Sequence, residues 1–179
     1  MRSDVEVLQR IVITGGPGAG KTAVLEYLRR QGFATGEDAA REIIRSRKQA
    51  GLSPRPEAVL FARQILEKEV EAYRSALSAP TFFERGVIDA VAFLASAGGL
   101  SETEADSLVA EYPYQAVFIF PPWEEIYCVD EERDHTFAHA EAVYHATSRF
   151  YRRCGYEPVE VPRASIEDRG RFILGQTGA

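Results

Sequence analysis

The first residues whose types and spacing could do chemistry form the segment GGPGAGKT, which runs from Gly15 to Thr22. A glycine followed after four residues by Gly-Lys-Thr is the phosphate-loop pattern, and here it follows an apolar run and opens an expected helix. Glycines let the backbone curl so that several N–H groups point at one anion, and the helix N-terminus adds positive potential. Lys21 can reach β- and γ-phosphates, and the Thr22 hydroxyl can ligate Mg²⁺. The residues expected to bind nucleotide phosphates are Gly15, Gly16, Pro17, Gly18, Ala19, Gly20, Lys21, Thr22 and Ala23.

A second chemical set lies in the segment FFERGVID, from Phe82 to Asp89. Glu84 directly follows an apolar run and could hold Mg²⁺ through water or accept a proton from an attacking hydroxyl. The forked guanidinium of Arg85 could hold a phosphate or another substrate group. Asp89, about one turn into the next helix, is a further substrate-binding candidate. The alternative is that Glu84 and Arg85 are solvated charges and Asp89 is an N-cap. The nearby phosphate loop favours a functional role for Glu84 and leaves both interpretations of Asp89 open.

An alternation of strands and helices must position these residues. The pattern predicts helices that begin near Lys21, Asp38, Glu57, Asp89 and Glu102, a helix ending near Arg153, and a last one after SIED. In the first helix we expect Ala23, Leu25 and Leu28 to face inward; in the third, Ala62, Leu66, Val70, Tyr73 and Leu77. Its polar residues, Arg63, Gln64, Glu67, Lys68 and Glu69, are expected on a solvated face. Ser101 and Glu104 predict a capping box.

The expected strands cover residues 10–14, 33–35, 80–84, 116–120 and 157–161. Because they alternate with helices, we predict an α/β fold with a mostly parallel five-stranded sheet covered by helices on both faces. Ligands of such sheets bind at the carboxyl ends of the strands, which is where Glu84 and Arg85 are expected.

Composition narrows the class of protein. The 179 residues predict a single domain over 1–179, and 21 Lys and Arg against 27 Asp and Glu give a net charge of −6. No basic run or tail suggests nucleic-acid binding. Cys128 and Cys154 make neither a zinc motif nor a disulfide framework, so we expect free thiols in a reducing compartment. With no apolar signal core and no 18-residue apolar stretch, the expectation is a cytoplasmic protein without a membrane span.

Several motifs together resemble a known family. The segments GGPGAGKT, DAAREII, FFERGVIDA, FIFPPWEEIY, DEERDHTF and VEVPRASIEDR look like those of small P-loop proteins described as AAA-type ATPase or kinase domains. These are related to the ribosylnicotinamide kinase domain of NadR-type proteins and to animal GTP- and lipid-binding proteins. The resemblance spans about residues 10–174 and implies a three-layer P-loop NTPase sandwich.

The resemblance also implies roles on the acceptor side. DAARE is similar to a family EAARE, whose acid and arginine face the acceptor in kinase members, so Asp38 and Arg41 would do so here. The Glu84–Arg85 pair, more often Asp-Arg in the family, also resembles the Glu-Arg pair of deoxynucleoside kinases. Either Asp38 or Glu84 could then act as the base.

Residues about 121–137 are expected to form a small lid. Arg133 lies among acids in DEERDHTF, and a lid arginine could neutralise charge on a transferring phosphate. Local pairing with neighbouring acids explains Arg133 equally well. Trp123 is expected to pack the root of the lid against the core.

These observations favour an ATP- and Mg²⁺-dependent kinase for a small, nucleoside- or nucleotide-like acceptor. The alternative is a regulatory NTPase or switch with a protein or lipid partner. Without a guanine-reading NKxD segment, ATP is favoured over GTP. A mechanical AAA+ motor is disfavoured, because TFFER lacks the Asp-Glu ending whose glutamate would activate water.

Overall fold

Five parallel strands form the sheet of the computed structural model, which describes residues 9–77, 80–127 and 136–178. Their spatial order is β2-β3-β1-β4-β5, with every neighbouring pair parallel. The strands are β1 (Arg10–Gly15), β2 (Ala34–Thr35), β3 (Thr81–Glu84), β4 (Ala116–Phe120) and β5 (Val159–Glu160). The predicted α/β sheet is confirmed.

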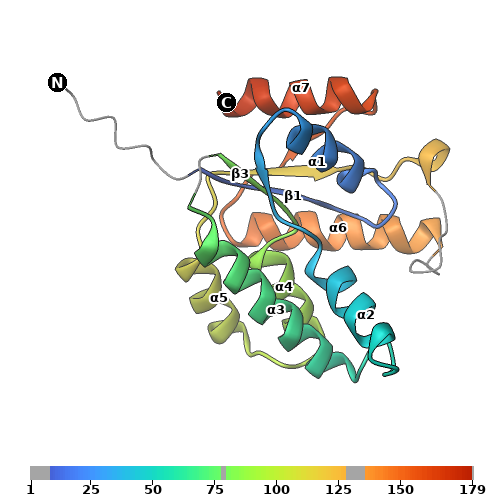
Figure 1. Cartoon of the computed structure of the whole chain (residues 1–179). Helices are drawn as coiled ribbons and strands as arrows, with labels where there is room; N and C mark the ends of the chain where they lie inside the picture. Colours follow the sequence, from blue (N-terminus) through green and yellow to red (C-terminus); the bar gives the residue numbers. More distant parts are fainter. Residues whose placement is uncertain (1–8, 78–79, 128–135, 179) are drawn as a thin grey trace.

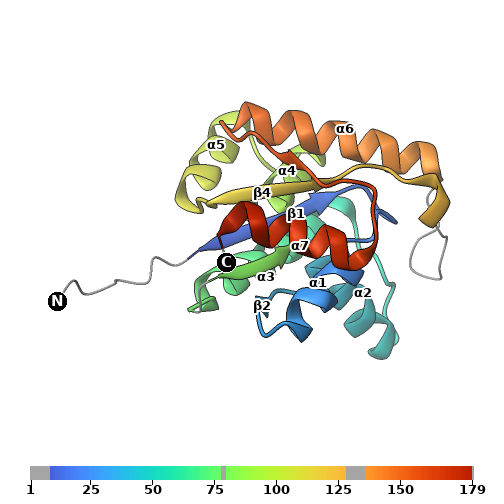
Figure 2. The same ribbon diagram turned by 90° about the horizontal axis from the view of Figure 1, so that it is seen from above.

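Helices connect these strands and cover both faces of the sheet (Figures 1 and 2). They are α1 (Lys21–Arg30), α2 (Ala39–Gln49), α3 (Ala58–Ser75), α4 (Val87–Ser96), α5 (Glu102–Glu111), α6 (Phe137–Arg153) and α7 (Ile166–Thr177). A short 3-10 helix, η1 (Glu124–Ile126), follows β4. The predicted capping box of Ser101 and Glu104 begins α5.

Two apolar layers hold the helices against the sheet, because successive strand residues point to opposite faces. On one face α1 and α7 pack on strand residues such as Ile11, Ile13 and Phe118. On the other face α4, α5 and α6 pack on Val12, Phe83 and Val117. A third cluster joins α2, α3 and α4 away from the sheet, and its members are Ala39, Ile43, Ile44, Phe61, Ile65 and Ala90.

Some expected core positions differ from those observed. In α1 the buried apolar residues are Val24, Leu25 and Leu28, whereas Ala23 is exposed where the helix leaves the phosphate loop. Leu77 lies beyond the end of α3 with 79% of its surface exposed, so the helical spacing that included it does not continue that far.

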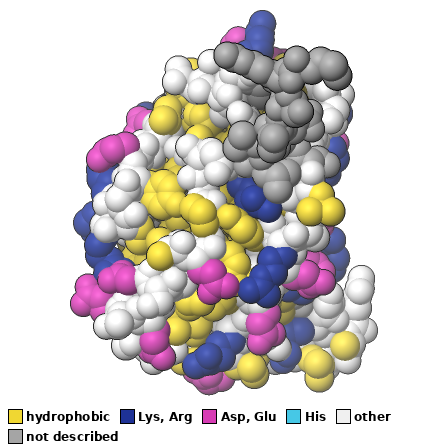
Figure 3. Space-filling view, turned by 90° about the vertical axis from the view of Figure 1, so that its left-hand side faces the viewer, with side chains coloured by type: hydrophobic (Ala, Val, Ile, Leu, Met, Phe, Trp, Pro, Cys, Tyr) yellow, Lys and Arg dark blue, Asp and Glu magenta, His cyan; other side chains and the backbone are white. Residues whose placement is uncertain are grey.

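Two further features are the charge distribution on one face and the length and hydrophobicity of the helices. On the side of the molecule where the chain enters β1, acidic and basic side chains of the described residues are interspersed (Figure 3). None of the helices in the described ranges combines the length and hydrophobicity needed to cross a bilayer.

Candidate active site

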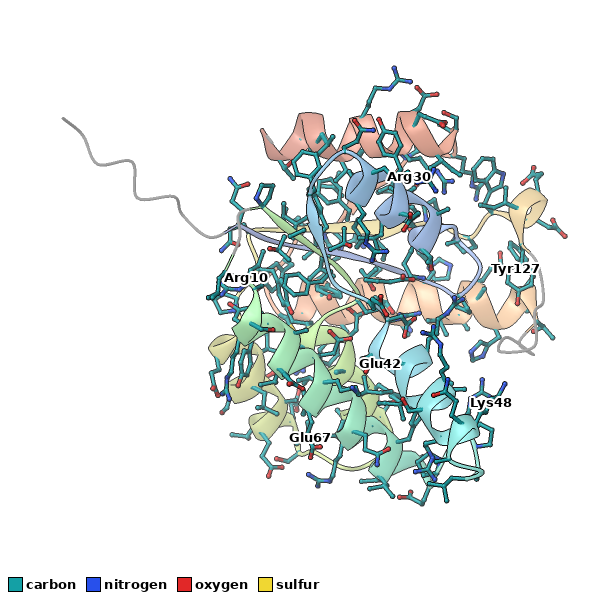
Figure 4. All side chains as sticks on the ribbon, viewed as in Figure 1. Arg10, Arg30, Glu42, Lys48, Glu67 and Tyr127 are labelled. Carbon is teal, nitrogen blue, oxygen red and sulfur yellow. The ribbon has the colours of Figure 1, made fainter. Side chains whose placement is uncertain are left out.

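The phosphate loop lies between the end of β1 and the start of α1, and two of its glycines are required by close contacts. A Cβ on Gly16 would come 2.4 Å from the Ala140 carbonyl oxygen of α6. Gly18 has a φ of +73°, and a Cβ there would lie 2.5 Å from the Tyr127 ring, which extends beside the loop (Figure 4). The loop is therefore held between α6 and the segment after η1, with its backbone fixed around one concavity.

Lys21 is folded into this concavity. Its ammonium donates to the carbonyl oxygens of Gly16 at 2.8 Å and Gly15 at 3.4 Å, and the residue is buried. Burial, with repulsion from Arg85, lowers the pKa of Lys21 to about 8. Burial takes water away from the ammonium group and so disfavours its charged form. An anion bound in the loop would favour the charged form again.

Thr22 and Glu84 meet on the other side of the loop. The parallel register sets Glu84 of β3 beside Ile13 of β1, so the last residue of β3 reaches the loop that follows β1. The Thr22 hydroxyl donates to Glu84 Oε1 at 2.8 Å, and Glu84 is only 4% exposed. Mg²⁺ in nucleotide sites takes few protein oxygens, its other ligands being phosphates and waters, so this hydroxyl–carboxylate pair fits a magnesium ion. Within the described residues there is no group of three or more His, Cys, Asp or Glu side chains that could hold a metal.

Arg85 adopts a strained backbone at the point where the candidate groups converge. Its φ of +67° is the one positive φ of a non-glycine residue in the described part of the chain. Such a conformation costs about 1–3 kcal/mol and persists only where neighbours enforce it. Here Arg85 N–H donates to the Ile13 carbonyl at 2.9 Å, and the guanidinium lies 3.7 Å from Asp89 and 4.0 Å from Asp38. Burial acts to lower the pKa of Arg85, but Asp38, Asp89 and then Glu84 outweigh it and the pKa is raised.

Asp89 joins three elements through its two carboxylate oxygens. Thr14 at the end of β1 donates its hydroxyl to Oδ1 at 2.5 Å, and Tyr151 of α6 donates its phenol to Oδ2 at 2.6 Å. Burial, with the charge of Asp89, raises the pKa of Tyr151 well above its usual value. Sequence reasoning singled out Asp89 but missed Thr14 and Tyr151, because nothing in their local sequence shows that they share a partner.

Asp38 and Arg41 begin α2, next to Arg85. Asp38 is the N-cap, and its Oδ1 accepts from the Arg41 backbone N–H at 3.1 Å. Its Oδ2 lies 4.0 Å from Arg85 Nε. Asp38 thus keeps one oxygen for the helix and presents the other toward the site.

A cavity of about 500 Å³ extends from the phosphate loop between α2, α3, α4 and α6. Its polar end carries Lys21, Asp38, Arg41, Arg85 and Asp89. The remainder is mostly apolar, with walls that include Ile44, Phe61, Ile65, Phe93, Val143 and Phe150. The volume lies within the range of small-molecule sites, and mostly apolar walls with a few polar groups are typical of such sites. Thr22 and Glu84 instead line a neighbouring hollow of about 190 Å³, which also reaches Asp38 and Arg41.

Glu69 also lines the larger cavity, which contradicts its expected place on a solvated helix face. The residue is 4% exposed, whereas Glu67 on the same helix is exposed (Figure 4). The reason is that α3 has two buried rows of residues. One row passes through Ala62, and the other consists of Phe61, Ile65 and Glu69, which are spaced four residues apart.

Arg169 of α7 is a further residue that sequence reasoning missed. Its guanidinium donates to the Ala19 carbonyl at 3.2 Å and lies 5.5 Å from the Trp123 ring centre and 5.7 Å from that of Phe120. Trp123 therefore contacts an arginine that supports the phosphate loop, and its expected packing role stays a prediction. The lid arginine, Arg133, lies outside the described residues.

Comparisons with known proteins identify the family and the fold of the chain. A family model described as an AAA domain matches residues 10–169. The structure is similar to that of deoxyadenosine kinase from M. mycoides with products dCMP and dCDP bound, with a TM-score of 0.65 and 13% identity over 95% of this chain and 99% of that one. It is also similar to NadR in complex with NR, with a TM-score of 0.71 and 16% identity over 96% of this chain and 52% of that one. The chain thus spans about half of NadR, and at these identities the likeness shows the fold. A comparison with curated proteins finds no match to the sequence.

Proposed function

The chain belongs to the AAA domain family, and from that premise we propose that it is a P-loop kinase that transfers the γ-phosphoryl group of ATP to a hydroxyl of a nucleoside-like molecule. One observation carries the proposal. Residues of the phosphate loop and a cluster of carboxylates and arginines together line the polar end, or mouth, of the mostly apolar cavity of about 500 Å³. Hydrolysis of a nucleotide needs only water beside the phosphates. A cavity of this size beside the loop provides room for an acceptor.

The nucleotide end of the site uses the loop itself. Backbone N–H groups of the loop and the N-terminus of α1 would bind the phosphates. Lys21 would exchange its contacts with the Gly15 and Gly16 carbonyls for phosphate oxygens. Arg169, which donates to the Ala19 carbonyl, would keep the loop in shape without touching the reacting atoms.

Thr22 and Glu84 would hold the magnesium ion, Thr22 through its hydroxyl and Glu84 through a bound water. When bound, Mg²⁺ supplies charge neutralisation on the phosphate oxygens. The 2.8 Å hydrogen bond keeps the two oxygen groups together before any metal arrives. Glu84 is thereby engaged on the metal side.

Asp38 is then the better candidate for the base that orients the acceptor hydroxyl. It lines the acceptor cavity, which Glu84 does not. Arg85 and Arg41 at the same mouth would position the transferring phosphoryl group and neutralise its charge. Catalysis would consist mainly of positioning and electrostatic stabilisation, as is usual for phosphoryl transfer. Arg133 on the lid-like segment would add charge when the site closes.

The structural neighbours support the nucleoside-like character of the acceptor. One is a deoxyadenosine kinase and the other is NadR with NR bound. A magnesium-dependent nucleoside kinase accounts for the cavity and for the acids that line it and the neighbouring hollow beside the phosphate loop. We place it in the cytoplasm, where ATP is available, with the whole chain acting as one nucleotide-binding domain.

The test is product formation from a defined mixture. The purified protein is incubated with Mg·ATP, or Mg·GTP for comparison, with and without a pool of nucleosides and other small metabolites, and products are identified by mass spectrometry. We expect a phosphorylated metabolite that requires the pool and disappears in Lys21→Ala. Asp38→Asn should lower kcat by about 10²-fold or more, as loss of a general base does. Asp106→Asn on the exposed surface of α5 serves as the matched control.

Two outcomes would contradict the proposal. Tight nucleotide binding with slow hydrolysis and no product from the pool would favour the regulatory switch. A kinase in which Glu84→Gln removes turnover but Asp38→Asn does not would reverse the roles of the two acids.

A further inference from the structure

Glu69 is a buried carboxyl group in the acceptor cavity that the proposed phosphoryl transfer does not use. Phe61 and Ile65 precede it on the same line of α3, and all three side chains line the cavity. A polar group in a largely apolar wall costs free energy unless it is hydrogen-bonded. A ligand that fills the cavity therefore contacts a carboxyl that can form a further hydrogen bond besides the one from the Ala39 N–H.

The surroundings of Glu69 favour its neutral form. Burial is the largest cause that raises its pKa well above the usual value, and the charges of Asp89 and Asp38 act in the same direction. The attraction of Arg85 and a hydrogen bond from the Ala39 backbone N–H act in the opposite direction but less strongly. The other titratable groups near it are phenols, those of Tyr114 and Tyr151.

These same contacts locate the carboxyl within the cavity. The Ala39 N–H belongs to the first turn of α2, next to Asp38, so Glu69 lies where the apolar wall meets the polar mouth. An acceptor whose hydroxyl approaches Asp38 would extend its remaining atoms along Glu69 toward Ile65 and Phe61. The carboxyl is thus placed to contact the edge of a ring that enters this wall.

The chemistry of a carboxyl group indicates what that edge should carry. A protonated carboxyl has one O–H donor and an accepting oxygen, and an ionised carboxyl only accepts. An N–H donor on the ligand is therefore satisfied in either state, whereas an accepting group is satisfied only in one. We propose that the Glu69 carboxyl selects the acceptor by binding an N–H₂ group on its planar ring, an inference that rests on the proposed kinase function.

Matched nucleoside pairs that differ only in the amino group test this inference. The pairs are cytidine with 2-pyrimidinone riboside, and adenosine with purine riboside. The wild-type protein should favour the amino member of at least one pair by about tenfold in kcat/KM, mainly through KM, as expected for one hydrogen bond to a buried group. Glu69→Met, which keeps most of the volume but removes the polar oxygens, should bring the ratio to within about twofold of one with kcat little changed. Glu69→Gln, whose amide oxygen still accepts, should keep the preference.

The exposed Glu67 on the same helix provides the matched control, since Glu67→Gln should leave the ratio as in wild type. A second measurement does not need Glu69→Met to fold. In infrared difference spectra, the carboxyl stretching band absent from Glu69→Gln should shift when the amino member binds wild type and stay in place when its partner binds.

The outcomes separate this inference from the proposed function. Turnover of both members of each pair with equal kcat/KM, or an unchanged preference in Glu69→Met, would overturn the role of Glu69 and leave the kinase standing. A preference that follows the sugar hydroxyls instead of the ring would also overturn it. Failure of every nucleoside to bind overturns it too, and the wider metabolite pool then decides whether the protein phosphorylates anything.

Discussion

The carboxylate of Asp89 connects the strand of the phosphate loop to two helices of the acceptor cavity, and Asp89→Asn removes its charge while keeping its shape. In wild type the two oxygens accept from Thr14 and Tyr151, and the Arg85 guanidinium lies 3.7 Å away. The asparagine amide has a single accepting oxygen, so one of the two hydroxyls loses its acceptor. The other hydroxyl is left with a neutral acceptor in place of a charged one.

The size of the effect follows from these two hydrogen bonds. A hydrogen bond to a charged group contributes about 1.5–3 kcal/mol and one between neutral groups about 0.5–1.5 kcal/mol. Losing one bond costs about 1.5–3 kcal/mol and making the other neutral costs about 1–1.5 kcal/mol, so the free energy of unfolding should fall by about 2.5–4.5 kcal/mol. The contact with Arg85 is largely buried, with side-chain exposures of 24% for Arg85 and 7% for Asp89, so removing the charge of Asp89 adds to this loss. For a chain of this length the melting temperature should fall by about 5–18 °C.

Urea unfolding of wild type, Asp89→Asn, Tyr151→Phe and the double variant measures this effect. Since Tyr151 acts through Asp89, Tyr151→Phe should cost less in the Asp89→Asn background than in wild type. The exposed Asp106→Asn should change the free energy of unfolding by less than about 0.5 kcal/mol. A similarly small loss in Asp89→Asn, or strict additivity in the double variant, would refute the idea that this carboxylate holds the three elements together.

Three further outcomes follow from the contacts described above. Gly16→Ala should abolish nucleotide binding in a fluorescence titration, because its Cβ would meet a backbone oxygen of α6 at 2.4 Å, while Gly175→Ala, with open space around it, should leave binding intact. Arg169→Met removes the hydrogen bond to the phosphate loop and should weaken nucleotide binding by about 3- to 10-fold; an unchanged affinity would show that the loop keeps its shape alone. Because the pKa of Glu69 is raised in the folded state, its stabilising contribution is complete below the unfolded pKa of about 4.5 and is lost as the pH rises through the folded value. Wild type should thus lose stability relative to Glu69→Gln by up to about 1.4 kcal/mol per pH unit above pH 4.5, and parallel stability curves would disprove this.

The phosphate loop and the sheet could be predicted from the sequence because their signals are local. The segment Gly15–Thr22 has its function in its own backbone, and the strand before it and the helix after it are visible as adjacent apolar patterns. Likewise the alternation of strands and helices leaves few arrangements other than a parallel sheet. The capping box of α5 was found for the same reason, since both its residues lie within one turn.

The larger cavity, where we propose that the acceptor binds, could not be predicted in this way, because its parts come together only through packing. Tyr151 lies 62 residues from Asp89, and no feature of either segment indicates that they pair. Glu69 did leave a signal: it lies four residues after Ile65 and eight after Phe61. The neighbouring row of residues through Ala62 is apolar along its length and is enough to predict a helix with one buried face, so the row through Phe61 and Ile65 is not needed for that prediction. A charged residue that continues an apolar line is the pattern that could have identified it.

The division of roles between the two candidate acids follows from where their strands end. Glu84 is the last residue of β3, and the register with β1 sets it beside the phosphate loop, where Thr22 takes one of its oxygens. The chain after β2 continues beyond the edge of the sheet before α2 begins, so Asp38 lies at the helix start and faces the cavity. Both acids line the smaller hollow, but Glu84 accepts from the Thr22 hydroxyl, whereas Asp38 lies 4.0 Å from Arg85 and also lines the larger cavity. The short loop from Gly36 to Asp38 therefore helps to set the position of the proposed base.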